Sequence, residues 1–292
     1  MDEAFSPGIR PVRLGALACL WALLVAGATA PATAEARRTS NPLQVDRYQK
    51  TPAGTDETSP SLEEGLGAVR RLRTQITYNL DGEPLRSELE GTGVVVEIDG
   101  RKLVLSLAHV VGEDLTAESE WRGPAAWRLK GRQQATRTWI DLPAGEVEIV
   151  LVHRDPKSDL AFFSLPEEIT APALPFPTGE SGRLRIGDFV YLLGRLEGTD
   201  LHVRSGIVSA LSPTARVAEL PIAQNVFMIS APLSVGDSGS PVLAVRDGRY
   251  ELVGIAQGKY ATAREAGWVL RIEPILATLR NSLSDKSVSA SR

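Results

Sequence analysis

Gly91–Val110, GTGVVVEIDGRKLVLSLAHV, contains two runs of Val, Leu and Ile on either side of the pair Asp99-Gly100. Val and Ile favour strands, and an Asp-Gly pair supplies the positive φ angles that a two-residue hairpin turn requires. We therefore expect two antiparallel strands, at 88–98 and 102–107, joined by a tight turn.

A second Asp-Gly pair, Asp247-Gly248, separates two further apolar runs, and the same punctuation by Gly, Pro and Asp continues from Val69 onward. Many short strands at such spacing are typical of all-β barrels and sandwiches. The pattern predicts an all-β fold with two six-stranded antiparallel barrels, at about 66–165 and 180–272, on either side of the Pro-rich connector 166–179. The other expected strands lie at 69–78, 135–142, 146–153, 160–165, 188–195, 201–211, 225–231, 240–246, 250–257 and 267–272.

One segment near the end of the chain has a helical pattern. Within residues 273–283, Ile275, Leu276 and Leu279 recur at spacings that place them on one face of a helix. We expect a short C-terminal helix there, followed by a polar, disordered tail at 284–292.

The first segment has the features of an export signal. Arg10 and Arg13 precede an apolar run, Leu14–Ala28, and small residues follow it. This order is typical of a signal peptide, which we expect to comprise residues 1–34. An uncleaved membrane anchor is the alternative, but the run is shorter than the ~20 apolar residues that span a bilayer. Residues 35–65, rich in Pro, Thr, Ser and Glu, are expected to form a flexible lead-in.

Cysteine content indicates the compartment. The single cysteine, Cys19, lies in the apolar run, so the exported protein would contain no disulfide. Small animal secreted domains usually depend on disulfides. We therefore expect a bacterial envelope protein, either periplasmic or secreted, with membrane contact only through the signal peptide if it is not cleaved.

Charge and histidine content exclude several classes of ligand. The net charge is −4, from 32 basic and 36 acidic residues that are interspersed along the chain. A nucleic-acid partner would require a basic patch or stripe, so none is expected. The three histidines have no metal-ligand spacing and no cysteine to assist them. We expect no metal and no cofactor.

GDSGSP, Gly236–Pro241, places Ser238 between two glycines. A serine hydroxyl attacks a carbonyl only when a base takes its proton and a third group orients that base. His109, in LVLSLAHV, is the candidate base, and Asp159, in DPKSDLA, is the candidate orienting group. Taken singly, the histidine and the aspartate also have structural interpretations. Their occurrence together with the Gly-Ser-Gly motif on a β pattern indicates a nucleophilic serine site.

These segments resemble the trypsin-like serine protease superfamily, and especially its cysteine-poor bacterial branch with the HtrA-type proteases, over about residues 66–283. Gly91–Val95, the segment with His109, the segment with Asp159 and GDSGSP are similar to motifs of that family and occur in the family's order. The resemblance implies that His109, Asp159 and Ser238 form a catalytic triad.

The resemblance also implies the rest of the site. The backbone N–H groups of Gly236 and Ser238 would form an oxyanion hole, Pro232 would form the floor of the substrate pocket, and Ala256 and Gly258 would lie on the strand that pairs with substrate. Because Pro232 carries no charge, we expect a small or medium apolar residue before the scissile bond. HtrA-type proteases usually add a PDZ module, which we do not expect here.

Two details differ from the family pattern or extend it. In zymogen-activated members, the aspartate that corresponds to Asp237 pairs with a new N-terminus, but the chain has no Ile-Val-Gly-Gly activation sequence. We expect Asp237 to have another partner, or none, and activity to need no cleavage. The long segment 112–145 carries Trp121, Trp127 and Trp139, which either shape a substrate cleft or cover the first barrel.

The predicted function is that of an exported serine endopeptidase that hydrolyses peptide bonds in protein or peptide substrates through an acyl-enzyme. The main alternative is a catalytically silent trypsin-like binding or scaffold protein. A third reading is esterase or other acyl-transfer activity from the same serine site.

Overall fold

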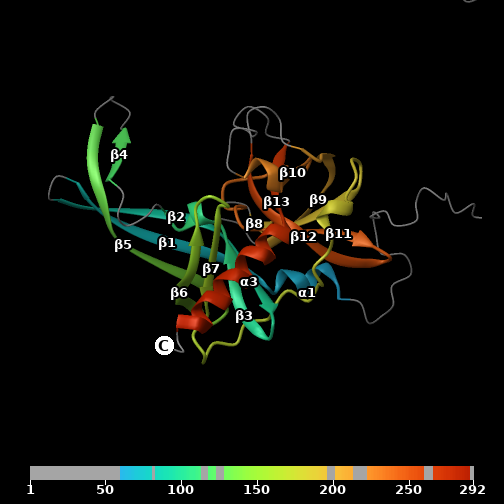
Figure 1. The fold of residues 1–292 in the computed structure, drawn as a ribbon, viewed down its shortest axis with the longest axis horizontal. Coiled ribbons are helices and arrows are strands. Elements are labelled where there is room, and N and C mark those ends of the chain that lie inside the picture. The colour runs from blue at the N-terminus through green and yellow to red at the C-terminus, as the bar shows by residue number, and fades with distance from the viewer. Residues whose placement is uncertain are drawn as a thin grey trace, which may run out of the picture. The chain divides into compact units, whose positions relative to one another are not determined.

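The computed structural model describes residues 60–80, 83–112, 118–122, 128–195, 201–212, 222–259 and 266–289, all of which belong to one compact unit, Leu43–Arg292. Within these ranges the chain forms thirteen strands, two α-helices and three 3-10 turns (Figure 1). The expected signal peptide and most of the expected lead-in lie outside the described residues, as does the end of the expected tail.

The first barrel consists of β1, β2, β3, β7, β6 and β5 in that order, and the pairing of β1 with β5 closes it. All of its strand pairs are antiparallel. Its core contains Leu72, Val94, Val104, Ile140 and Phe162, which are fully buried. The strands are β1 (Val69–Leu80), β2 (Glu83–Ile98), β3 (Arg101–Ser106), β5 (Arg128–Leu142), β6 (Gly145–Asp155) and β7 (Leu160–Ser164).

The second barrel is closed in the order β10, β13, β12, β11, β8 and β9, and its pairs are also antiparallel. Val190, Val208, Phe227, Val253 and Val269 fill its core. Two six-stranded antiparallel barrels are therefore confirmed. The strands are β8 (Phe189–Arg195), β9 (Leu201–Ala210), β10 (Val226–Ile229), β11 (Pro241–Arg246), β12 (Arg249–Lys259) and β13 (Gly267–Arg271).

Both expected Asp-Gly hairpins are present. Asp99 and Gly100 have φ angles of 51° and 75°, and Asp247 and Gly248 have φ angles of 51° and 77°. Two consecutive positive φ angles match the right-handed twist of the flanking strands. These two turns fix the registers of β2 with β3 and of β11 with β12.

The first hairpin and one additional strand differ from the expectation. β1 continues to Leu80 and pairs there with Glu83, the first residue of β2, so the hairpin is longer than predicted. The residues between them are Asp81-Gly82, a third Asp-Gly pair that the sequence analysis did not use. β4 (Glu118–Arg122) was not predicted; it pairs with the first part of β5, at the end of β5 away from β6 (Figure 1).

A short helix begins the described domain inside the segment expected to be a flexible lead-in. In α1 (Leu62–Leu66), the Ser61 hydroxyl accepts from the Glu64 N–H at 3.2 Å, and the Glu64 carboxylate accepts from the Ser61 N–H at 2.6 Å. This reciprocal capping box stabilises a helix N-terminus. Gly65 is buried, and a Cβ atom there would lie 2.4 Å from the Phe176 ring. Close packing therefore orders the chain before β1.

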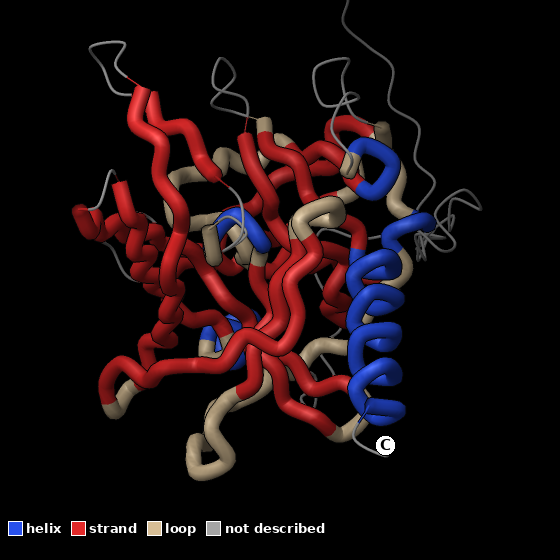
Figure 2. The backbone as a smooth tube through the Cα atoms, turned by 60° about the vertical axis from the view of Figure 1, so that its left-hand side comes forward, coloured by secondary structure: helices blue, strands red, loops and turns tan. Residues whose placement is uncertain are grey.

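The C-terminal helix is present but longer than expected. α3 (Ile272–Ser289) packs against β12 and β13, with Ile275 and Leu279 buried, and runs beside the strands (Figure 2). It continues through 284–289, which we expected to be disordered, because that segment contains no Gly or Pro to end the helix. Among the described helices, none has both the length and the apolar character that crossing a bilayer requires.

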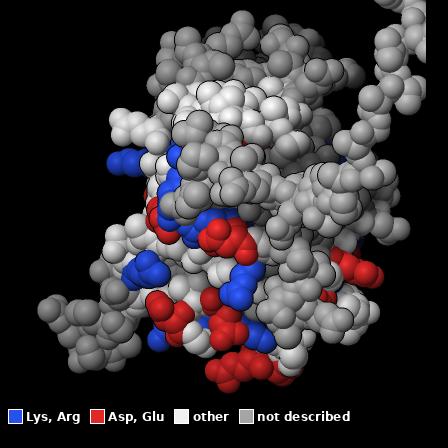
Figure 3. Space-filling view, turned by 90° about the vertical axis from the view of Figure 1, so that its right-hand side faces the viewer, with Lys and Arg blue, Asp and Glu red and all other residues white. Residues whose placement is uncertain are grey.

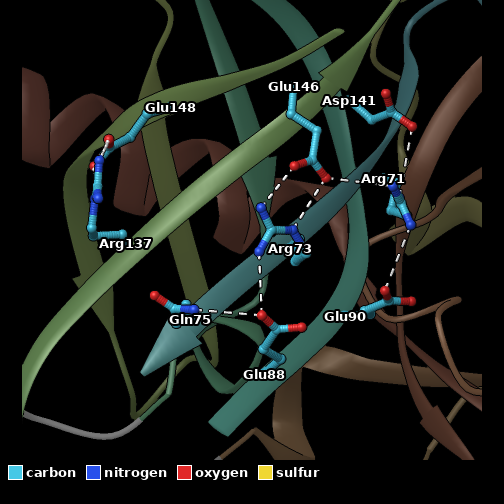
Figure 4. A network of polar contacts seen from close by, with 9 residues as sticks. All are labelled: Arg71, Arg73, Gln75, Glu88, Glu90, Arg137, Asp141, Glu146 and Glu148. Carbon is cyan, nitrogen blue, oxygen red and sulfur yellow. Dashed lines mark hydrogen bonds and ion pairs between the residues drawn. The ribbon is translucent and has the colours of Figure 1, made fainter. Parts of the chain in front are cut away.

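Charged side chains form a network on the outer surface of the first barrel (Figure 4). Arg73 of β1 pairs with Glu146 of β6 at 2.7 Å and with Glu88 of β2 at 3.3 Å. The guanidinium groups of Arg73 and Arg137 lie 4.5 and 5.0 Å from the ring centre of Trp139. Trp139 therefore covers the barrel. The side chains of the other two tryptophans of segment 112–145 lie outside the described part of the structure.

Basic and acidic side chains are also mixed on another face of the molecule. Figure 3 shows Lys and Arg next to Asp and Glu over the lower half of the view, with no separation by sign. This distribution agrees with the interspersed charge in the sequence.

Replacing Leu279 by Ala should lower the free energy of unfolding by about 2–5 kcal/mol, because it leaves a cavity under α3 where a fully buried side chain now packs. Urea denaturation followed by circular dichroism measures this change. Asn281→Ala, at an exposed position of the same helix, is the control and should change stability little. Equal stabilities of the two variants would show that α3 does not contribute to the folded core.

Candidate active site

His109 lies just after the β2–β3 hairpin of the first barrel. β3 ends at Ser106, and the 3-10 turn η1 (Ala108–Val110) follows. Ala108 and Val110 are buried on either side, whereas the His109 side chain is 45% exposed. The turn therefore anchors its apolar residues in the core and presents the imidazole at the surface.

Asp159 contacts His109 through both carboxylate oxygens. Oδ1 accepts a hydrogen bond from the His109 backbone N–H at 2.9 Å, and Oδ2 lies 2.8 Å from His109 Nδ1. Asp159 is the last residue of the turn between β6 and β7 and has a left-handed φ of 54°. Asp and Asn adopt this conformation more readily than other residues with a side chain. The left-handed turn thus brings a buried carboxylate under the imidazole.

The contact defines the tautomer of His109. An ionised carboxylate only accepts hydrogen bonds, so Nδ1 must carry the proton that Asp159 Oδ2 accepts. In the neutral imidazole the Nε2 atom then has a free lone pair. The ring is therefore oriented to accept a proton at Nε2.

Asp155 supports the turn that carries Asp159. Its Oδ1 accepts from the Lys157 backbone N–H at 3.0 Å. Burial raises the pKa of Asp155, but hydrogen bonds from Ser158 and from the Lys157 and Ser158 N–H groups outweigh it and place the pKa below its usual value. The carboxylate consequently stays ionised and holds the turn at neutral pH.

Ser238 lies in the loop between β10 and β11, which comprises residues 230–240 and which we call the nucleophile loop. Gly236 and Gly239 both have φ angles of 97°, a conformation that favours glycine. Ser238 Oγ donates to the Gln257 carbonyl at 3.4 Å. Among the described residues, Ser238 makes no hydrogen bond to His109. Catalytic hydrogen bonds are often long before substrate binds and shorten in the substrate complex.

Gln257 links the two parts of this arrangement. Its Nε2 donates to Asp159 Oδ2 at 2.7 Å, while its carbonyl accepts from Ser238. The register of β12 with β13 shifts at this residue, between Ala256 and Gly258. A bulge of this kind redirects a side chain. Sequence analysis missed Gln257 because no local signal marks the bulge.

Thr92 of β2 joins the first barrel to the nucleophile loop. Its N–H donates to the Ser238 carbonyl at 2.8 Å, and its hydroxyl donates to the Gly236 carbonyl at 2.6 Å. The Thr92 carbonyl in turn accepts from the Ser106 hydroxyl at 2.8 Å. A Cβ atom on Gly239 would lie 1.9 Å from that carbonyl oxygen, so only glycine fits there.

Two backbone donors of the nucleophile loop are available beside Ser238. Within the described ranges, the N–H groups of Gly236 and Ser238 donate to no backbone carbonyl, whereas those of Asp237, Gly239 and Ser240 do. Uncommitted N–H groups next to a nucleophile are suited to binding a negatively charged oxygen.

Residues 91–255, more than half of the chain, match the family model described as a trypsin-like peptidase domain. The chain belongs to the trypsin-like peptidase family.

Curated relatives of this trypsin-like chain include two serine proteases. It is 28% identical to the periplasmic serine endoprotease DegP of Escherichia coli over 168 residues, which cover 56% of the chain and 29% of DegP. It is 30% identical to the mitochondrial serine protease HTRA2 of Bos taurus over 168 residues, covering 56% of the chain and 30% of that protein. The match therefore spans about a third of each relative.

Solved structures of HtrA-type proteases share the fold. One with a bound decapeptide has a TM-score of 0.56 and 19% identity, over 76% of this chain and 65% of that chain. Another, with a tripeptide, has a TM-score of 0.51 and 20% identity, over 76% and 63%. The trypsin-like resemblance seen in the sequence is thus confirmed.

Asp237 of the trypsin-like domain has a partner within the chain. Its Oδ1 accepts a hydrogen bond from Arg204 Nη2 of β9, and its Oδ2 accepts from the Ser234 N–H at 2.5 Å. The side chains of Arg204 and Asp237 are only 14% and 1% exposed. Arg204 also donates to the Pro232 carbonyl at 2.5 Å. Sequence analysis missed Arg204, which lies 33 residues before Asp237, because no motif surrounds it.

The residues expected to bind substrate occupy different environments. Pro232, the expected pocket floor, is exposed, and its neighbour Leu233 is buried instead. A Cβ atom on Gly267 would lie 2.3 Å from Leu233 Cδ1 and 3.3 Å from the Gly258 carbonyl oxygen. Leu233 therefore fills the space beside Gly267, whereas the Trp268 ring fills the space beside Gly258, where a Cβ atom would lie 2.9 Å from it.

Ala256 was expected to lie on the substrate-pairing strand, but its backbone contacts the nucleophile loop. Its carbonyl accepts from the Gly239 N–H at 2.9 Å, and its N–H donates to the Ser240 carbonyl at 2.8 Å. The residue is fully buried. Both of its backbone polar groups are thus committed to the nucleophile loop, which Ala256 supports from β12.

Across the described ranges, no group of three or more His, Cys, Asp or Glu side chains is arranged to hold a metal ion. His153 instead stacks on Phe162, with ring centres 6.0 Å apart.

Arg204→Gln should destabilise the fold by about 3–5 kcal/mol, because it leaves the Asp237 carboxylate buried without its cation. Urea denaturation measures this change. Arg249→Gln, at an exposed position of β12, is the matched control and should have little effect. The double variant Arg204→Gln with Asp237→Asn should lose less stability than the two single losses added together. Additive losses would mean that the pair is not coupled.

Proposed function

We propose that the chain is an exported serine endopeptidase that hydrolyses peptide bonds with Ser238 as nucleophile, His109 as base and Asp159 as orienting group. The observation that carries this proposal is the double hydrogen bond between Asp159 and His109, beside a serine whose loop offers two uncommitted N–H groups. Membership of the trypsin-like peptidase family and the similarity to DegP and HTRA2 support it.

In the acylation step, Ser238 Oγ forms a bond to the substrate carbonyl carbon while His109 Nε2 takes the hydroxyl proton. The carbonyl electrons move to its oxygen, which becomes an oxyanion. When they return, the C–N bond breaks, and the imidazolium gives its proton to the leaving amine. The product of this step is an acyl-enzyme and a free amine.

In the deacylation step, water takes the place of the amine. His109 removes a proton from the water as its oxygen attacks the acyl carbon, and the same proton returns to Ser238 Oγ when the ester bond breaks. The acid product leaves, and the serine is regenerated.

Asp159 has two roles in this scheme. It keeps the proton on Nδ1, and its charge stabilises the imidazolium that forms in each step. Gln257 acts as a positioning residue, because its side-chain amide donates to the same Oδ2 that His109 Nδ1 contacts. Three donors, from His109 and Gln257, thus fix the carboxylate in place.

The N–H groups of Gly236 and Ser238 form the oxyanion hole in this proposal. One such donor contributes about 3 kcal/mol of transition-state stabilisation. Thr92 donates hydrogen bonds to the carbonyls of the same two residues, and these bonds restrict the backbone of the nucleophile loop at two points. Donors fixed before the reaction need no reorganisation when charge develops on the substrate oxygen.

The proposed enzyme needs no activation cleavage. Asp237 already has a cation, Arg204, and a backbone donor, Ser234, so no new N-terminus is needed to pair with its carboxylate. The nucleophile loop is held by residues of the same chain.

Labelling with a fluorophosphonate tests the serine site. We expect an adduct on Ser238, located by mass spectrometry, and no adduct on that residue in Ser238→Ala. His109→Ala should abolish the labelling, because no base would then activate the hydroxyl. Asp159→Asn should slow hydrolysis of a protein substrate such as casein by about 10⁴-fold while keeping the fold.

A folded chain that forms no adduct and hydrolyses neither casein nor an activated ester would contradict the proposal and favour the catalytically silent alternative. Turnover of short acyl esters without casein hydrolysis would favour the esterase reading.

Leu233 makes the proposed pocket small. It occupies the space beside Gly267, and neither it nor Pro232 carries a charge. A pocket of this kind accepts a small or medium apolar side chain on the residue that supplies the scissile carbonyl, which we call the acyl residue. It offers no partner to Lys or Arg.

Leu233→Ala should shift the preference of the acyl residue from Ala or Val toward Leu or Phe, by about tenfold or more in the ratio of kcat/KM values. Fluorogenic peptides that differ only at the acyl residue measure this ratio. Leu211→Ala, at an exposed residue after β9, is the control. An unchanged ratio in Leu233→Ala would place the pocket elsewhere.

The proposed location is the bacterial envelope, in the periplasm or outside the cell. The N-terminal segment with the features of a signal peptide supports export, and DegP is a periplasmic protease. Solved HtrA-type structures with bound peptides support protein or peptide substrates.

A further inference from the structure

A pocket of about 340 Å³ opens beside His109 on the side of the first barrel. His109 and Asp159 form part of its wall, together with Arg154 and Pro156 of the β6–β7 region and Tyr78 and Leu89 of the β1–β2 hairpin. The pocket is separate from the space that Leu233 fills beside Gly267.

Arg154 of β6 supplies a fixed positive charge to this pocket. Its Nη2 donates to the Gly112 carbonyl, and its Nε is enclosed without an acceptor. Among the described residues, its Nη1 has no hydrogen-bond partner. The guanidinium is therefore held in position by one bond and keeps a donor for another group.

Among the described residues of the wall, Arg154 and Asp159 carry opposite charges, but no ion pair joins them. Asp159 is the one described carboxylate in the wall, and His109 and Gln257 already donate three hydrogen bonds to it. No described carboxylate lies within ion-pair distance of Arg154. Of the described charged groups in the wall, Arg154 is the one that keeps a donor for a ligand.

The position of the pocket determines which part of a substrate enters it. Its wall includes His109, the proposed base, so a side chain in the pocket belongs to a residue next to the scissile bond. In the proposed site, the acyl residue takes the space beside Leu233 and Gly267. The side chain beside Arg154 is therefore that of a flanking residue, either the one before the acyl residue or the one after the bond.

We propose that Arg154 makes this enzyme selective for an acidic side chain, Glu or Asp, on a residue that flanks the acyl residue. The inference rests on the proposed endopeptidase function and specifies its substrate. A carboxylate that accepts from Arg154 Nη1 forms a charge-assisted hydrogen bond, which is stronger than a neutral one. A lysine in the same place meets a like charge and is disfavoured.

Matched fluorogenic peptides test the proposal. Each has Val as the acyl residue and Glu, Gln or Lys at one flanking position, with Ala at the other. At one of the two positions, we expect kcat/KM for Glu to exceed that for Gln by about tenfold and Lys to be cleaved more slowly than Gln. The Glu-to-Gln ratio should fall as salt is added, because ions screen a partly exposed pair. A ratio near one at both positions would overturn the proposal.

Variants assign the effect to Arg154. Arg154→Met should reduce the Glu-to-Gln ratio to near one, and Arg154→Lys should keep an intermediate ratio. The ratio does not depend on how much of a variant is folded, because both peptides report on the same active molecules. Lys157→Met removes an exposed cation from the next turn and is the matched control; it should keep the parent ratio. A parent-like ratio in Arg154→Met would refute the assignment.

The two proposals fail in different ways. If the parent cleaves none of the peptides faster than Ser238→Ala, the endopeptidase function fails. In that case, fluorescence anisotropy measures how tightly the labelled Glu and Gln peptides bind to the Ser238→Ala variant. Binding of the Glu peptide about tenfold tighter than the Gln peptide would support the acidic preference, and equal binding would overturn it.

Discussion

The hydrogen bonds from Thr92 to the Gly236 and Ser238 carbonyls are the constraint on which the candidate site depends. The nucleophile loop belongs to the second barrel, whereas His109 belongs to the first. Together with the bond from Gln257 of β12 to Asp159, the Thr92 bonds limit the shift of one barrel against the other and so restrict the distance from serine to histidine. Thr92 lies on β2, the strand that pairs with β3 just before His109. The register of the β2–β3 hairpin therefore relates the position of His109 to that of the nucleophile loop.

The fold and the residues of the candidate site could be predicted because their signals are local. Asp-Gly pairs and apolar runs specify hairpins over a few residues, and GDSGSP specifies a glycine conformation on each side of Ser238. The supporting residues were not predictable. Gln257 is 98 residues from Asp159, and its contact depends on a bulge in β12. The sequence analysis also did not predict the main-chain bonds from Ala256 to the nucleophile loop. Contacts between segments that are distant in the chain cannot be identified from a short motif.

The domain is held together without disulfides by several kinds of packing. Each barrel has its own closed ring of strands and an apolar core, and the larger core cluster also includes residues of α3. Closure removes the exposed strand edges of each ring. The buried Arg204–Asp237 pair adds a polar constraint beside the nucleophile. Such a pair is weak evidence for net stability, since burying two charges is costly; its clearest effect is to define where the loop lies.

The left-handed backbone at Asp159 has an evolutionary consequence. Asn tolerates this conformation nearly as well as Asp does, and a change of one nucleotide converts either aspartate codon into an asparagine codon. The turn, the barrel and the hydrogen bond to the His109 main chain can then persist after the charge has gone. A lineage that carries this change would keep a folded domain whose surface is free to acquire a binding role. The conformation that positions the Asp159 carboxylate thus also allows a single substitution to remove the acid of the proposed triad while the turn is kept.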